Sequence, residues 1–146
     1  MSSAPPSTPQ LRLTIDEVAA FLDAAFPPET RPSLGEVDSL EPNRLRLRLD
    51  PLPAMRRPGN IVSGPTLMGL VDVATYGVIA AHHGAESMAV TNALSIVFLR
   101  PCRFEPIFAD AHLLKLGRRL ATVDVRVWQE REDRLVAQST VGYAIP

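Results

Sequence analysis

The chain has little of what marks disulfide-bonded, nucleic-acid-binding or membrane-spanning proteins. It has one cysteine among 146 residues, which excludes an intrachain disulfide. Its 15 basic and 16 acidic side chains give a net charge of −1, so nothing favours nucleic acid or an anionic membrane as a partner. The N-terminus lacks the pattern of a secretory signal, and the longest apolar stretch, Leu67 to Ala81, is short for a membrane span. These absences predict a cytoplasmic protein.

What is present predicts one domain behind a short tail. Hydrophobic residues make up 46% of the chain and charged residues 21%, as in ordinary globular proteins of this size. The start is rich in proline and serine, so we expect a disordered tail over residues 1–13 and a single domain over 14–146. Thr14 and Glu17 have the spacing of a capping box at the start of a short helix, which Pro27 ends.

Hydrophobic periodicity predicts an α+β fold with about five strands and one long helix. Leu45, Leu47 and Leu49 alternate with arginines, as in a strand that covers a core on one side. From Pro65 to about His83 the chain is apolar on nearly every helical face, which predicts a helix enclosed by other structure. Four later segments have strand character and short joints, which is typical of an antiparallel meander. They are residues 88–101, 107–117, 119–130 and 133–146.

One carboxylate interrupts the predicted helix. Asp72 is the only charged residue between Arg57 and Glu86. Keeping a carboxylate ionised among aliphatic side chains is costly unless something compensates the charge. The aspartate therefore lies either on a narrow exposed stripe of the helix or in a small polar pocket with a function. Because the helix has no other charged residue to form a polar face, the pattern favours the pocket.

The start of the same helix has the residues of an anion site. Ser63 is a good N-cap, and Gly64 and Pro65 suit the first turn, where free N–H groups and the helix dipole favour an oxyanion. Gly64 precedes Asp72 by eight residues, which is ~12 Å along a helix axis. One chain alone therefore cannot bring both to a single acyl carbonyl. A second subunit whose helix runs antiparallel alongside would bring them together.

These features together resemble a known family. A long helix wrapped by an antiparallel sheet resembles the hotdog fold. The stretches "NIVSGPTLMGLVDVATYGV", "AVTNALSIVFLRPC" and "LLKLGRRLATVDVRVW" are similar to the acyl-CoA thioesterase superfamily, in particular its PaaI-like branch, over roughly residues 35–145. The resemblance implies that Asp72 is the general base or nucleophile, that Gly64 donates its N–H to the thioester oxygen, and that Thr91 orients water.

The resemblance also implies partners and substrate contacts. The substrate would be an acyl-coenzyme A thioester, without a further cofactor or metal. The protein would be a homodimer or a homotetramer made of two dimers, with the carboxylate and the oxyanion donor of one site coming from different subunits. The residues that the resemblance implies for substrate binding are Ser63, Asn92, Lys115, Arg118 and Arg119. Of these, Lys115, Arg118 and Arg119 would contact the coenzyme A phosphates.

One departure from the branch keeps other functions open. The helix begins with Ser63-Gly64-Pro65 where the branch has His-Gly-Gly, and Pro65 has no N–H to donate. A non-catalytic acyl-CoA-binding protein is therefore a second hypothesis. A hotdog hydratase or dehydratase ranks last, because it needs a catalytic histidine and no loop histidine precedes the helix.

Other residues that can carry chemistry are expected to have structural roles. Cys102 lacks a flanking catalytic motif and is interpreted as a packing residue, as are Trp128 and Tyr143. The adjacent His82 and His83 cannot both face one metal ion and are interpreted as the end of the helix.

Overall fold

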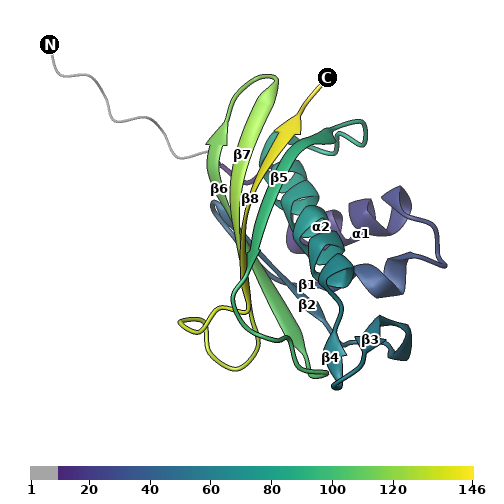
Figure 1. The fold of residues 1–146 in the computed structure, drawn as a ribbon. Helices are drawn as coiled ribbons and strands as arrows, with labels where there is room; N and C mark the ends of the chain where they lie inside the picture. Colours follow the sequence, from purple (N-terminus) through teal and green to yellow (C-terminus); the bar gives the residue numbers. More distant parts are fainter. Residues whose placement is uncertain (1–9) are drawn as a thin grey trace, which may run out of the picture.

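In the computed structural model, which describes residues 10–146, one long helix lies on one face of a six-stranded antiparallel sheet (Figure 1). This helix, α2, spans Gly64–His83. In spatial order the strands are β1 (Glu36–Glu41), β2 (Arg44–Leu49), β6 (Ile107–Leu116), β7 (Leu120–Trp128), β8 (Ala137–Ala144) and β5 (Val90–Phe98). The remaining elements are α1 (Ile15–Ala25), the 3₁₀ turns η1 (Arg31–Leu34) and η2 (Pro53–Met55), and a hairpin of β3 (Arg56–Arg57) and β4 (Ile61–Val62). The predicted hotdog fold is confirmed.

The core lies between α2 and the sheet, and strand alternation forms it. In β2 the three leucines at 45, 47 and 49 are buried, while the arginines between them lie on the opposite face. Val123, Val125 and Val127 of β7 are fully buried in the same way. The helix contributes Leu70 and Val71, both inaccessible to solvent. Burial of these alternate positions fixes which face of each strand meets the helix.

The predicted strand count and strand order need correction. The main sheet has six strands rather than about five, because β1 was missed. Its sequence, Glu36–Glu41, is polar at an outer edge of the sheet and shows no apolar alternation. The expected loop after β2 contains the small β3–β4 hairpin. The simple meander holds only for β6, β7 and β8. The β5 strand crosses to pair with β8, and β6 pairs with β2 and β7.

The expected burial of α2 on all sides holds for its second half only. From Val73 to His82 every helical residue is buried. In the first half Pro65 and Met68 form an open stripe, with half-buried Gly69 and Asp72 beside it. By length and apolarity α2 also qualifies as a membrane span, but 67% of the relevant window is buried inside the fold, as in a core helix. In the single chain the aspartate therefore lies half-buried at the edge of this open stripe.

The N-terminal boundary also differs from the expected one. The expected disorder of residues 1–9 lies outside the described residues. Residues 10–13 belong to the domain rather than the tail, since Arg12 and Leu13 donate backbone hydrogen bonds to Ala81. The capping box of α1 is confirmed: Thr14 accepts from the Glu17 N–H over 3.2 Å, and the Glu17 carboxylate accepts from the Thr14 N–H over 3.0 Å.

Candidate functional site

The half-buried Asp72 carboxylate is held by two hydroxyl groups from the sheet. Thr91 Oγ1 donates to Asp72 Oδ1 over 2.6 Å, and the Tyr143 hydroxyl donates to the same oxygen over 3.0 Å. Tyr143 also reaches the Asp72 backbone carbonyl at 3.3 Å. Among residues 10–146, Oδ2 accepts no hydrogen bond from another side chain. Two donors on one oxygen fix the carboxylate and leave the other oxygen to react.

Strand register brings these two hydroxyls to the helix. Thr91 of β5 and Tyr143 of β8 are directly paired across neighbouring antiparallel strands. Val141 and Tyr143 of β8 are both buried, so this side of the strand is the one that faces α2. The sheet positions the donors from residues that are distant in sequence, 19 and 71 positions from the aspartate.

Tyr143 was predicted to be a packing residue, and that interpretation was incomplete. It is 4% exposed and packs in the core, but its hydroxyl is directed at the carboxylate. Burial, with the Asp72 charge as a smaller contribution, raises the pKa of Tyr143 well above its usual range. The phenol therefore stays protonated near neutral pH and acts as a donor. A tyrosine in a strand has no sequence signal that distinguishes this role from packing.

The start of α2 keeps its backbone N–H groups free. Ser63 is the N-cap, as predicted, but its hydroxyl makes no capping hydrogen bond. It lies instead 2.9 Å from the Thr66 hydroxyl. Within the described residues no acceptor pairs with the Gly64 N–H, and Pro65 has none to offer. The free Gly64 N–H lies at the positive end of a 20-residue helix, where an oxyanion is stabilised.

Asp72 and Gly64 mark the two ends of one exposed surface. Thr91, near the start of β5, contacts Asp72, while Phe98, at its end, lies near Gly64. A Cβ atom added at Gly64 would be 3.4 Å from the Phe98 ring. Strand β5 therefore runs beside the open stripe of α2 in the opposite direction. It is also an edge strand of the sheet, with its outer edge unpaired by any described residue.

The remaining predicted substrate contacts divide into two groups. Asn92 lies at a bulge in β5 and does not face Asp72 as Thr91 does. Its side-chain oxygen lies on the outer face of the sheet, 2.6 Å from the position that a Cβ on Gly142 would take. Lys115, Arg118 and Arg119 line a hollow of about 360 Å³ at the β6–β7 turn. This turn lies at the Asp72 end of the sheet, because the Ile145 N–H bonds the Arg119 carbonyl two residues beyond Tyr143.

The His82 and Cys102 side chains, which were considered for metal or thiol chemistry, are buried in the core. His82 is 3% exposed; its Nε2 accepts from the Asn43 N–H, and its Nδ1 lies 2.8 Å from the Val78 carbonyl. Cys102 is buried, and burial raises the pKa of its thiol to about 12. No cluster of three or more metal-ligating side chains is found among residues 10–146.

Comparisons with known proteins agree with this fold. The family model of the thioesterase superfamily matches residues 59–136, which include all of α2 and β5 to β7. A structure from Silicibacter sp. TM1040, provisionally named a thioesterase, is 35% identical, with a TM-score of 0.85 and coverage of 95% of this chain and 96% of that one. The chain therefore belongs to the thioesterase superfamily. No curated protein matches it.

More distant structures share the fold. Zebrafish thioesterase superfamily member 2 is 22% identical, with a TM-score of 0.79 and coverage of 92% of this chain and 99% of that one. The Escherichia coli PaaI protein of the phenylacetic acid degradation operon is 18% identical, with a TM-score of 0.69 and coverage of 89% and 94%. These similarities support the predicted resemblance to the PaaI-like branch at the level of fold.

Proposed function

We propose that this protein hydrolyses an acyl-coenzyme A thioester in the cytoplasm. The observation that carries the proposal is the Asp72 carboxylate, fixed through one oxygen by Thr91 and Tyr143 and open on the other. Membership of the thioesterase superfamily supports the reaction class. A fixed carboxylate beside an open surface is the group that such a hydrolysis needs.

The chemistry follows from the free oxygen of Asp72. As a general base it takes a proton from water, whose oxygen attacks the thioester carbon. The electron pair moves to the carbonyl oxygen, where the Gly64 N–H stabilises the charge. Collapse of this intermediate breaks the carbon–sulfur bond, and the proton held by Asp72 passes to the departing sulfur, so the acid and the thiol of coenzyme A are released. Direct attack by the carboxylate would give an anhydride instead, which water then hydrolyses to the same products.

A second copy of the chain is needed to complete this site. Asp72 and Gly64 lie ~12 Å apart along the helix by its rise per residue. A two-fold axis near Met68 would place the two helices antiparallel, with Asp72 of one chain beside the partner's Gly64. Exposed apolar side chains support contact on this surface, since Met68 is 41% exposed and Phe98 49%. We therefore propose a homodimer, which can pair again into a tetramer.

The departure at the start of α2 favours one alternative, an acyl-CoA-binding protein without turnover. Ser63 replaces the imidazole of the related branch, and Pro65 removes one backbone donor. The remaining free N–H of Gly64 argues for hydrolysis, because one donor still faces the open surface.

A panel of acyl-CoA substrates decides between the two functions. We expect thiol release, detected with a chromogenic disulfide, from short, long and aromatic acyl-CoA substrates, with one class turned over fastest. Each substrate is also titrated calorimetrically against the protein. Binding without thiol release across the whole panel would establish the non-catalytic alternative.

The two hydroxyl donors to Asp72 have a testable role. We expect Tyr143→Phe to lower kcat about 10-fold with little change in KM, because it frees the carboxylate but leaves the substrate surface intact. Thr91→Val should lower kcat by a similar factor. Steady-state kinetics on the best substrate measures both. Tyr76→Phe is the matched control, since its hydroxyl donates to the Ser87 carbonyl, away from Asp72.

A merely structural role for Tyr143 would give a different result. If Tyr143 only packed in the core, activity would fall only as far as the melting temperature fell. Because Tyr143→Phe keeps the aromatic ring, we expect its melting temperature to stay close to that of the wild type while kcat falls. An unchanged kcat in both Tyr143→Phe and Thr91→Val would remove these residues from the mechanism.

A further inference from the structure

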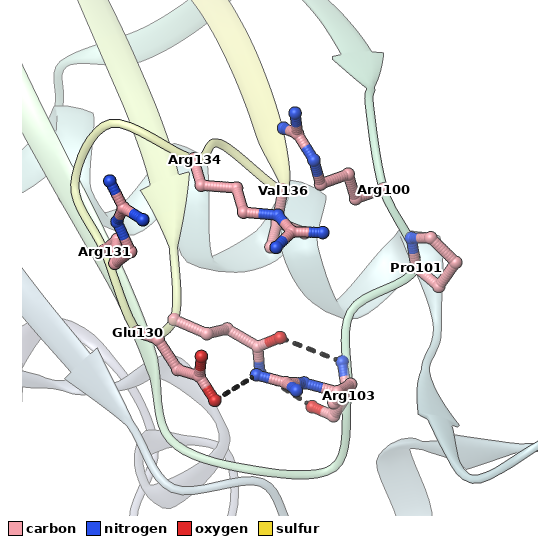
Figure 2. A pocket seen from close by; sticks show the side chains of 8 residues that line it. Arg100, Pro101, Arg103, Glu130, Arg131, Arg134 and Val136 are labelled. Atoms are coloured by element: carbon pink, nitrogen blue, oxygen red, sulfur yellow. Dashed lines mark hydrogen bonds and ion pairs between the residues drawn. The ribbon is translucent and has the colours of Figure 1, made fainter.

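A second basic surface lies at the opposite end of the sheet from Asp72. Between the β5–β6 connection and the β7–β8 loop there is a hollow of about 350 Å³, which Figure 2 shows from close by. Four of the residues that line it are arginines and one is acidic. They are Arg100, Arg103, Arg131, Arg134 and Glu130.

Two of these arginines are already neutralised by carboxylates. Arg103 pairs with Glu130 at 2.7 Å and with Glu105 at 3.3 Å, and the pKa of Arg103 is raised by these contacts. Arg131 pairs with Asp133 at 2.8 Å. Their positive charges are therefore offset before any ligand arrives.

The other two arginines have no such partner. Within residues 10–146, no carboxylate lies within 4.0 Å of the guanidinium of Arg100 or Arg134. Arg100 donates to the Leu135 carbonyl over 2.6 Å, which places its guanidinium beside the residue that follows Arg134. Figure 2 shows Arg100 reaching from the end of β5 and Arg134 from the β7–β8 loop toward the same part of the hollow. Two uncompensated guanidinium groups in one hollow favour an anion, and their planar donors suit phosphate oxygens.

The chain segment that lines the hollow continues directly from the residue beside the helix start. Phe98, which contacts the position of Gly64, is followed two residues later by Arg100. The backbone N–H groups of Leu99 and Arg100 both bond the Val136 carbonyl, so the end of β5 is held against the start of β8. A substrate whose carbonyl oxygen binds Gly64 therefore has this hollow on the same chain within reach of its polar end.

We infer that Arg100 and Arg134 bind a phosphate group of coenzyme A on the chain that supplies Gly64. The inference rests on the proposed function, and it assigns the substrate a contact besides the predicted one at Lys115, Arg118 and Arg119. The part of coenzyme A that links the thioester to the phosphates then crosses the end of β5 beside Phe98. The acyl group extends the other way, toward Asp72 of the partner subunit.

The test compares paired charge removals on the full chain. We expect Arg100→Gln with Arg134→Gln to weaken binding of free coenzyme A about 10-fold or more by calorimetry, because two charged hydrogen-bond donors are lost. KM for the best acyl-CoA should rise by a similar factor while kcat stays within about 2-fold of wild type. Arg126→Gln is the matched control, since Arg126 is exposed and pairs with Asp124 on β7 itself.

Further probes identify the phosphate and separate this inference from the function. Dephospho-coenzyme A lacks the 3′-phosphate. If it binds the wild type and the double variant with equal affinity, the hollow holds the 3′-phosphate of coenzyme A. If it binds the double variant more weakly than the wild type, the hollow holds the diphosphate. Unchanged coenzyme A affinity and KM in the double variant, with a loss in Arg118→Gln/Arg119→Gln instead, would overturn the inference while the function stands. If coenzyme A binding depends on Arg100 and Arg134 but no acyl-CoA is hydrolysed, the phosphate site stands and the proposed hydrolase function is refuted.

Discussion

Replacing Asp72 by asparagine should lower kcat for thioester hydrolysis about 10³-fold or more, since the proposed base or nucleophile is lost. Asparagine has nearly the same shape, and its side-chain oxygen can still accept from Thr91 and Tyr143. The fold and the substrate surface therefore stay intact. The measurement is the rate of thiol release on the best substrate of the acyl-CoA panel, at saturating concentration.

The control for this result is a matched change of charge elsewhere. Asp50→Asn removes the same charge from a side chain that is 70% exposed and pairs with Arg48. We expect this variant to keep the wild-type kcat, and both variants to bind coenzyme A with wild-type affinity. An Asp72→Asn protein that retains more than a tenth of the wild-type kcat would show that another group activates the nucleophile.

A heterodimer of two inactive variants should recover about half of the wild-type activity, because one of its two sites is intact. One chain carries Asp72→Asn, and the other carries Gly64→Pro, which removes the oxyanion N–H. Proline is favoured at the first position of a helix, so this change keeps the backbone. We expect the Gly64→Pro homodimer to lose about 10²-fold in kcat. The two chains are co-expressed with different affinity tags, and the doubly tagged dimer is isolated.

Only a site built between subunits gives this recovery. If Asp72 and Gly64 of one chain acted together, each site of the heterodimer would carry one defect, and its activity would not exceed that of the homodimers. Gly64→Ala is the matched control, because it keeps the N–H and its Cβ makes an ordinary contact with Phe98 at 3.4 Å. Sedimentation velocity checks the assembly, and a monomeric wild-type protein that hydrolyses acyl-CoA would contradict the shared site.

The sequence indicated the candidate site residues of α2 better than it indicated their surroundings. Asp72 stands out because a lone carboxylate in an apolar helix is costly, and Gly64 because helix starts have recognisable residues. Thr91 could be predicted through the family resemblance. Tyr143 could not, since burial and hydrogen bonding of a strand tyrosine depend on a neighbouring strand. The predicted contact at Asn92 stays untested, and its side chain lies beside Gly142 on the outer face of the sheet, opposite to Thr91.

The basic residues show the same limit. The pair at Arg118 and Arg119 is adjacent in sequence and therefore visible as a motif. Arg100 and Arg134 are separated by 34 positions, and no local pattern pairs them. They come together because the Val136 carbonyl accepts hydrogen bonds from the end of β5. Their lack of carboxylate partners, on which the proposed phosphate site rests, depends on which acidic groups reach Arg103 and Arg131.

The sequence by itself determined the fold class, the central helix and the carboxylate, because hydrophobic periodicity and the cost of a buried charge act locally along the chain. It also showed that Asp72 and Gly64 are too far apart on one helix to form a site alone. Only the tertiary structure decided that β5 crosses to β8, that Thr91 and Tyr143 share one oxygen of Asp72, and that Arg100 and Arg134 line one hollow. The reason is physical: strand order and register depend on contacts between distant segments, which local patterns do not encode.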